Sequence, residues 1–202
     1  MGQARLLGLT NQTSGGDRPD PREKRARLVS AARQVFAQDG YEASVQQICR
    51  VAGVGIGTFY HQFLDKADLM RSLMDEEHAY RIRAFDAMGA DPAGDAAVDV
   101  VRVLSGSDPA LLRAMIEACG IEPRLRNAGL DMRRESRGRL AAAFDRVREA
   151  RGARHPALDS TTAASATLAL GDTELARDGT AEVARIVNIL AFAESNGRNI
   201  RV

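Results

Sequence analysis

The segment from Ser44 to Lys66, SVQQICRVAGVGIGTFYHQFLDK, constrains the fold most strongly, because its local signals predict two short helices joined by a tight turn. Ser44 is a good N-cap residue, and Gln47 follows at the spacing of a capping box. An apolar face at helical spacing comes next. Gly53 then stands where the helix has to stop and reverse, a position that suits a residue without Cβ.

The second short helix is expected to start around Gly55–Gly57 and to continue to Phe63. Phe59 and Phe63 are four residues apart, so they share one face and can pack against the first helix. The polar side chains left on the outer face are those of Thr58, Tyr60, His61 and Gln62. Two short helices around a glycine turn, with exposed hydroxyl, imidazole and amide groups, indicate a helix-turn-helix DNA reader.

The run A-G-V-x-x-G-T-x-Y-x-x-F-x-x-K, present as Ala52 through Lys66, resembles the DNA-binding signature of TetR-family transcriptional regulators. The likeness covers about residues 24–75 and includes the preceding segment LVSAARQVFAQDGYEAS, which is similar to the first helix of that family. Gly55 departs from the usual serine and leaves the recognition helix without a side-chain N-cap. Cys49 stands where the family commonly has alanine, and Gln47 stands where it commonly has an acidic residue. Base preference is therefore not carried over.

The resemblance implies that Thr58, Tyr60 and Lys66 contact phosphates, while the start of the recognition helix and the helix before it read bases. Hydroxyl and ammonium groups donate to phosphate oxygens, and a carboxamide such as that of Gln46 can pair with adenine N6 and N7. Glycines at the helix start let the backbone approach the DNA. The expected DNA-binding residues are Ser44, Gln46, Gly55, Gly57, Thr58, Tyr60, His61, Gln62 and Lys66.

The charge distribution agrees with a DNA-facing amino-terminal part. Residues 1–66 contain nine Lys and Arg against six acidic residues, a net charge of +3, whereas the remainder holds 19 against 21, a net charge of −2. A basic end on a mildly acidic body is typical of one nucleic-acid-facing module. Arg22, Lys24 and Arg25, near the start of the first predicted helix, can reach phosphates, and solvated surface charge is the alternative for each.

Composition excludes several other classes of protein. No apolar run approaches the roughly 18–20 residues of a membrane span, and the amino-terminus lacks the apolar core of a signal peptide, so we expect a cytoplasmic protein without a membrane partner. Cys49 and Cys119 lie far apart with no C-x-x-C pair, and the three histidines form no H-E-x-x-H motif. We therefore expect no disulfide scaffold, no metal site and no cofactor.

Hydrophobic periodicity predicts an all-α protein. The resemblance implies that it consists of an N-terminal three-helix helix-turn-helix domain and a C-terminal helical ligand-binding and dimerisation domain. The predicted division is a tail over 1–20, the DNA-binding domain over 21–68 and the ligand-binding and dimerisation domain over 69–202. The first helix is expected from Pro21 to Asp39–Gly40, and a long helix over 66–88 links the two domains. Five further helices are expected over 92–105, 110–118, 123–150, 159–177 and 180–196.

The resemblance also implies a homodimer on a palindromic double-stranded DNA operator, most often as a repressor, although the sequence does not separate a repressor from an activator. The last two predicted helices are expected to form the dimer face. A small-molecule effector is expected in a cavity within the C-terminal domain. Its candidate lining residues, for which core packing is the alternative, are Phe85, Met88, Leu104, Met115, Cys119, Met132 and Phe144.

Two alternative functions are considered. In one, the Cys119 thiol rather than a ligand triggers release from DNA, which makes the chain a redox-sensing regulator. In the other, the C-terminal domain is an enzyme of unknown type, although no catalytic constellation supports it. The run G-V-G-I-G-T resembles a glycine-rich phosphate loop, but it follows a helix and lacks a Gly-Lys-Ser/Thr end, so nucleotide binding is not expected.

Overall fold

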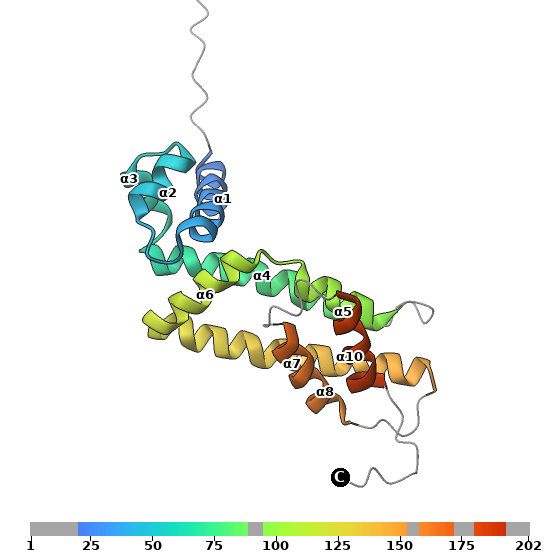
Figure 1. Ribbon diagram of the computed structural model, residues 1–202. Helices are drawn as coiled ribbons and strands as arrows, with labels where there is room; N and C mark the ends of the chain where they lie inside the picture. The colour runs from blue at the N-terminus through green and yellow to red at the C-terminus, as the bar shows by residue number, and fades with distance from the viewer. Residues whose placement is uncertain (1–19, 89–94, 153–157, 172–179, 193–202) are drawn as a thin grey trace, which may run out of the picture.

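The computed structural model describes residues 20–88, 95–152, 158–171 and 180–192, and every regular element among them is a helix, as predicted. Figure 1 shows their arrangement. The helices are α1 (Pro21–Asp39), α2 (Val45–Ala52), α3 (Ile56–Gln62), α4 (Lys66–Ala87), α5 (Ala96–Ser105), α6 (Pro109–Ile121), α7 (Pro123–Ala150), α8 (Ser160–Gly171) and α10 (Thr180–Phe192).

Helix starts follow local capping chemistry. Asp20 accepts a hydrogen bond from Arg22 N at 3.0 Å, with Pro21 in the first turn of α1. Asp65 accepts from Asp68 N at 2.8 Å and caps α4, and Asp108 caps α6 in the same way. These side chains satisfy N–H groups that have no partner within the helix, so the starts were predictable from sequence.

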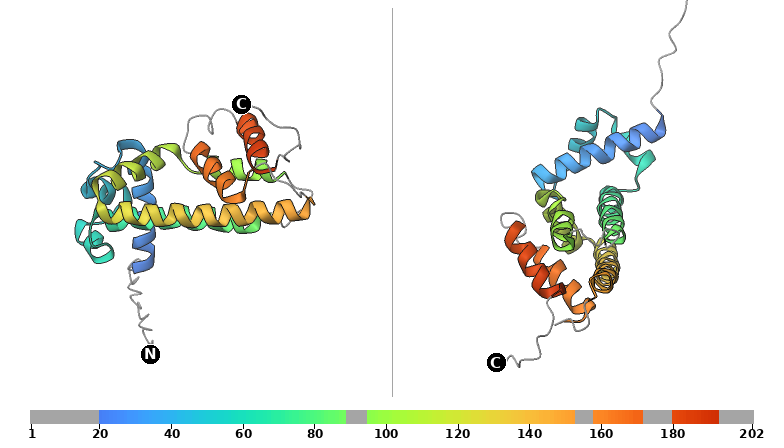
Figure 2. Two further views of the ribbon diagram at one scale, coloured as in Figure 1. Left: turned by 90° about the horizontal axis from the view of Figure 1, so that it is seen from below. Right: turned by 90° about the vertical axis from the view of Figure 1, so that its right-hand side faces the viewer.

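The helices form an elongated body (Figures 1 and 2). The bundle of α1, α2 and α3 lies at one end, and the pair α8 and α10 lies towards the other. The long helices α4 and α7 lie side by side and connect the two ends. Two ion pairs show that α4 and α7 run in the same direction. Asp65 at the start of α4 pairs with Arg124 at the start of α7, and Asp86 near the end of α4 pairs with Arg139 further along α7.

Two hydrophobic cores hold this body together. The first joins α1, α2 and α3 to the first half of α4, to α6 and to Leu125 of α7. The second lies among the end of α4, α5, the last part of α7, α8 and α10. Met70 and Leu73 of α4 belong to the first core, so packing is continuous across residues 68 and 69, where the sequence suggested a domain division.

Several predicted details need correction. Helix α5 begins at Ala96 after the cap Asp95 rather than at 92, and α6 continues to Ile121. Leu130 of α7 is apolar and yet 56% exposed. The buried stripe of α7 includes Leu125, Ala128 and Leu140, at three- and four-residue steps, so Leu130, two residues after Ala128, lies on another face.

Other predictions fall outside the described residues. These are the tail over 1–19 and the extensions of the last two helices to 177 and 196. No helix in the described part of the chain combines the length and the apolar character that crossing a bilayer requires.

Candidate nucleic-acid interface and ligand cavity

The start of α2 is fixed by the predicted capping box. Ser44 Oγ accepts from Gln47 N at 3.2 Å, and Gln47 Oε1 accepts from Ser44 N at 2.8 Å. The same glutamine donates through Nε2 to Asp39 Oδ2 at 3.2 Å. Gln47 therefore links the start of α2 to the end of α1, and this contact helps to fix the orientation of α2 relative to α1.

The turn between α2 and α3 depends on Gly53. Its backbone is left-handed, with φ 63° and ψ 39°, and its N–H donates to Arg50 O at 3.2 Å. Arg27 of α1 donates through Nη2 to Ala52 O at 2.6 Å and to Gly53 O at 3.2 Å. A guanidinium at this place binds carbonyls that the end of α2 leaves without helical partners.

The end of α3 is held in a similar way by Arg25 of α1. Its Nη1 donates to Gln62 O at 3.0 Å and its Nη2 to Ser72 Oγ at 2.9 Å, while the guanidinium lies 4.1 Å from the centroid of the Phe63 ring. Phe63 in turn packs against Phe59, with ring centroids 5.7 Å apart, and both are buried as predicted. The guanidinium of Arg25 therefore has an internal structural role that the sequence did not predict.

The outer surface of α2 and α3 carries most of the predicted DNA-binding residues. Gln46, Gly55, Gly57, Tyr60 and His61 are exposed, and Tyr60 is 59% exposed. A second group is half-buried and consists of Ser44, Thr58, Gln62 and Lys66. The fold thus presents hydroxyl, amide and imidazole groups together on one pair of helices, as the sequence predicted.

Gly55 is the N-cap of α3 and provides no side-chain hydrogen bond there. A Cβ added to Gly55 or to Gly57 would meet no other atom within 4 Å. The fold itself therefore does not require glycine at either position. Any need for a small residue there has to come from a molecule that approaches this surface.

Lys66 has an internal role that the sequence did not predict. Its ammonium donates to Tyr41 O at 2.6 Å and to Ala43 O at 3.3 Å, and it lies 4.3 Å from the centroid of the Tyr41 ring. Burial, and then the nearby Glu122 and Asp65, raise the pKa of Tyr41 to about 12, so the phenol stays neutral. Lys66 therefore attaches the start of α4 to the connection between α1 and α2.

Two exposed residues were missing from the predicted set. Arg50 follows Gln46 by four residues, so both lie on the same face of α2. Ile56 is 44% exposed at the first position of α3, between the two open glycines. The helical spacing of Arg50 was a usable signal, whereas an aliphatic residue such as Ile56 is ordinarily assigned to the core.

A cavity of about 340 Å³ opens among α4, α6 and α7, next to the ends of α5 and α8. Four predicted lining residues surround it: Leu104, Met115, Cys119 and Met132. The other three do not line this cavity, because Phe85, Met88 and Phe144 are buried in the second core. Sequence periodicity identified them as inward-facing but does not say which buried residues enclose a space. Lining residues that the prediction missed include Met74, His78, Leu112 and Ser136.

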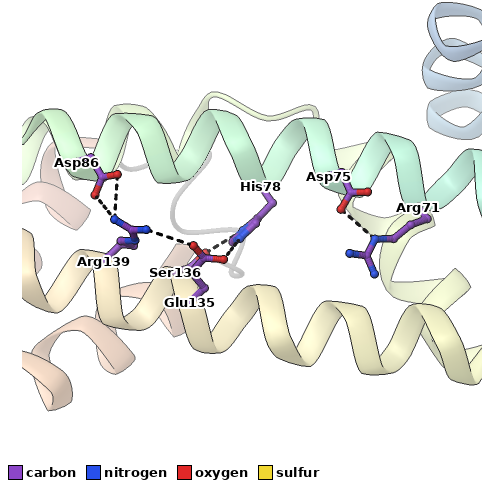
Figure 3. A network of polar contacts seen from close by, with 7 residues as sticks. All are labelled: Arg71, Asp75, His78, Asp86, Glu135, Ser136 and Arg139. Carbon is purple, nitrogen blue, oxygen red and sulfur yellow. Dashed lines mark hydrogen bonds and ion pairs between the residues drawn. The ribbon is translucent and has the colours of Figure 1, made fainter.

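His78 and Ser136, which line the cavity, belong to a network of polar contacts between α4 and α7 (Figure 3). His78 Nε2 lies 3.0 Å from Glu135 Oε2, and its Nδ1 lies 3.4 Å from Ser136 Oγ. Arg139 extends from Glu135 towards Asp86 of α4. The hydrogen bond from His78, together with the nearby Arg139, holds the pKa of Glu135 below its usual range. The imidazole is therefore held in a defined orientation beside an ionised carboxylate.

Cys119 Sγ donates to Leu125 O at 3.5 Å on the cavity wall. Burial raises the pKa of this thiol, although the nearby Arg126 opposes the shift. A protonated thiol is a poor nucleophile. Within the residues described, no group of three or more His, Cys, Asp or Glu side chains is placed to hold a metal ion.

The amino-terminal part of the chain matches the family model described as bacterial regulatory proteins, tetR family, over residues 28–73. The chain is 38% identical over 58 residues to the HTH-type transcriptional regulator UidR of Escherichia coli strain K12, which covers 27% of this chain and 30% of that protein. An HTH-type transcriptional regulator of Staphylococcus aureus strain USA300 is 40% identical over 53 residues, or 26% of this chain and 29% of the relative. The chain thus matches less than a third of the length of these curated relatives.

Solved structures are similar over a much larger part of the chain. Salmonella enterica GusR has a TM-score of 0.69 at 22% identity, covering 86% of this chain and 98% of that one. The fatty acid degradation regulator FadR from Bacillus halodurans has a TM-score of 0.67 at 22% identity, covering 84% and 95%. At this level of identity the likeness concerns the fold, which includes both the helix-turn-helix bundle and the helical body.

Proposed function

We propose that this chain, which belongs to the TetR family of bacterial regulatory proteins, is a sequence-specific DNA-binding transcriptional regulator. In this proposal it acts as a homodimeric, ligand-responsive repressor in the cytoplasm. The observation that carries the proposal is the α2–α3 pair, whose exposed polar side chains flank two glycines that the fold itself does not require.

The proposed contacts follow from the chemistry of that surface. The hydroxyls of Thr58 and Tyr60 donate to phosphate oxygens, and Gln46 pairs with a base edge in the major groove. Arg50, on the same face as Gln46, adds positive charge. Lys66 retains a phosphate role because an ammonium has three donors and two are engaged by the carbonyls of Tyr41 and Ala43.

A homodimer is proposed because a short recognition helix reads only a few base pairs. Two-fold symmetry places a second copy in the next turn of the major groove, roughly 34–36 Å away, on a palindromic operator. The proposed dimer face is the outer surface of α8 and α10. It offers small exposed residues on α8 and Ile189 of α10, which is 57% exposed. Burying that side chain against a symmetry mate favours association.

Ligand control is proposed because the helices around the cavity also contact the DNA-reading bundle. Arg33 of α1 pairs with Glu77 of α4, a cavity-lining residue. Glu117 Oε2 of α6 accepts from Tyr41 N at 3.1 Å. A ligand that prefers one arrangement of α4 and α6 would therefore bias the spacing of the two recognition helices, and operator affinity would follow that population.

Selection of bound sequences from a random duplex pool tests the DNA-binding proposal. We expect one palindromic sequence to be enriched and its binding to weaken steeply as salt rises. Tyr60→Phe should lower affinity for every sequence, whereas Gln46→Ala should relax preference at one position per half-site. Arg134→Gln, an exposed change on α7 outside this surface, serves as the control. A pool without enrichment, or identical binding by wild type and Tyr60→Phe, would contradict the proposal.

The alternatives receive less support. A thiol whose pKa is raised by burial is not poised for oxidation, so Cys119 does not favour a redox switch. The cavity brings Ser136 Oγ within 3.4 Å of His78 Nδ1, but this contact is longer than an O–H hydrogen bond ordinarily is. The curated relatives that the chain matches are transcriptional regulators, so an enzyme in the C-terminal part is the less favoured alternative.

A further inference from the structure

The three helices that enclose the cavity each contribute one arginine to its lining. They are Arg81 of α4, Arg113 of α6 and Arg133 of α7. Arg113 and Arg133 are exposed, and Arg81 is half-buried, so the guanidiniums lie towards the solvent side. A guanidinium has five N–H donors in a planar fork, and a bond to another protein group leaves donors that a ligand can use.

The negative charge in the lining is already neutralised. Glu77 is the one acid among the cavity-lining residues of the described chain. Its carboxylate pairs with Arg33 and accepts from Ser107 Oγ at 2.7 Å, and its side chain is only 14% exposed. His78, which also lines the cavity, is bound to Glu135 and Ser136. The lining therefore offers cationic hydrogen-bond donors to a ligand. It contains no unpaired carboxylate, among the described residues, that would repel an anion.

The inner part of the cavity is apolar and rich in sulfur. Met74 and Met115 are buried, Met132 and Cys119 are partly buried, and all four line the space. Methionine side chains are flexible and polarisable, and their sulfur atoms make favourable contacts with aromatic rings. A volume of about 340 Å³ lies in the range of pockets that hold small organic molecules.

We propose that the cavity binds an aromatic organic acid, with its ring system among the methionines and its carboxylate or sulfonate group at the arginines. This inference rests on the proposed function, in which such a molecule is the effector. A charged head that accepts from two guanidiniums gains charge-assisted hydrogen bonds, while the apolar body leaves water.

Two fluorescent probes that differ by one group test the proposal. These are 1-anilinonaphthalene-8-sulfonate and its uncharged counterpart N-phenyl-1-naphthylamine, titrated into the full chain. We expect one molecule of the sulfonate per chain. Arg113→Gln and Arg133→Gln should each weaken sulfonate binding by about fivefold and leave the uncharged probe unchanged. Arg134→Gln is the matched control, because it neighbours Arg133 on α7 and pairs with Asp131 outside the cavity.

A second variant checks the location of binding. Met132→Trp fills the cavity and should weaken both probes, with circular dichroism showing that the helices are retained. Sulfonate affinity that is equal in wild type and in the Arg113→Gln/Arg133→Gln double variant would overturn the proposal, whatever Met132→Trp does. So would a wild-type chain that binds neither probe.

Operator binding separates this inference from the proposed function. The arginine variants should still enrich the wild-type DNA sequence. A chain that selects DNA but does not distinguish the two probes would refute the ligand class alone. A chain that distinguishes the probes as expected but enriches no DNA sequence would refute the regulatory function and leave the ligand class supported.

Discussion

Arg33 on α1 is paired with Glu77 on α4, and the second oxygen of that carboxylate accepts from the Ser107 hydroxyl at 2.7 Å. Because Glu77 also lines the cavity, one side chain joins the DNA-reading bundle, the cavity wall and the connection between α5 and α6. A ligand that displaces this carboxylate would change the contact between α1 and α4 directly. In the proposed ligand control, Glu77 is therefore a residue through which a molecule in the cavity would act on α1.

Replacing Glu77 by Gln should lower the free energy of unfolding by about 1 kcal/mol, since it removes one charge from a partly buried pair. The loss stays modest because Arg33 keeps its second partner, Glu76 Oε2, at 3.0 Å. Urea unfolding at neutral pH measures the change. The control is Asp75→Asn in the exposed pair with Arg71 on the same helix, which should cost less than about 0.5 kcal/mol. If both variants lose the same free energy of unfolding, the Arg33–Glu77 pair contributes no more to stability than an exposed ion pair does.

The two types of glycine in the helix-turn-helix should respond in opposite ways to alanine. Gly53→Ala places a Cβ at φ 63° and 2.7 Å from Arg27 Nη2, so we expect a loss of about 1–2 kcal/mol of stability. Gly57→Ala meets no atom within 4 Å inside α3, so we expect a gain of up to about 1 kcal/mol. Thermal unfolding gives both values.

Operator binding then distinguishes fold from function at Gly57. If the DNA backbone approaches this glycine closely, the more stable Gly57→Ala variant should bind its selected sequence more weakly than wild type. Fluorescence anisotropy with a labelled duplex measures this. Unchanged affinity in the stabilised variant would show that Gly57 lies away from the DNA.

The parts of this fold that the sequence predicted correctly are those set by neighbours in the chain. The Ser44–Gln47 box and the end of the helix at Gly53 each depend on residues within one helical turn. Their chemistry is local, so it can be recognised from spacing alone. The helical class and most helix bounds followed from the same signals.

What the sequence missed depends on contacts between distant residues. Arg25 and Lys66, which the sequence suggested as phosphate contacts, also donate to carbonyls 37 and 25 residues away, and the sequence did not predict these internal bonds. Phe144 and Met74 are both inward-facing by periodicity, but only Met74 borders the cavity. The packing of whole helices against one another decides which buried side chains touch and which line a cavity. A local sequence pattern contains no information about that packing.

The cap of α4 should make stability depend on acid pH. Partial burial alone would raise the pKa of Asp65, but hydrogen bonds from Arg124 and from Asp68 N outweigh it and hold that pKa below its usual range. The unfolded carboxyl, with a pKa of about 3.9, binds a proton first as pH falls. The stabilisation is therefore complete above that value and is lost as pH falls through the lower, folded pKa.

Asp65→Asn tests this, because asparagine retains a capping oxygen but does not titrate. Wild type should exceed the variant in unfolding free energy at pH 7, and the difference should shrink between pH 5 and pH 3. Urea unfolding across this range gives the comparison. A difference independent of pH would assign the effect to the cap geometry rather than to the charge.

Arg148 connects three helices near the proposed dimer face. Its side chain is buried, and it donates to Ala191 O at 2.6 Å and to Leu158 O at 2.9 Å, with a further bond to Ser160 Oγ. Arg148→Leu leaves these buried acceptors without their donor, which should cost about 2–3 kcal/mol. The substitution also removes the hydrogen bonds that connect α8 and α10 to α7. The dissociation constant of the proposed dimer should therefore be higher in the variant than in wild type.

Arg146→Leu is the matched control. Arg146 lies two residues earlier on α7 and donates to Phe85 O at 2.9 Å at the end of α4, away from Ala191 and Ser160. It should lower stability but leave the dimer dissociation constant unchanged, because it does not hold α8 or α10. Sedimentation velocity over a dilution series measures both variants. If Arg148→Leu dissociates no more readily than Arg146→Leu, the α8–α10 surface is not the interface that holds the dimer together.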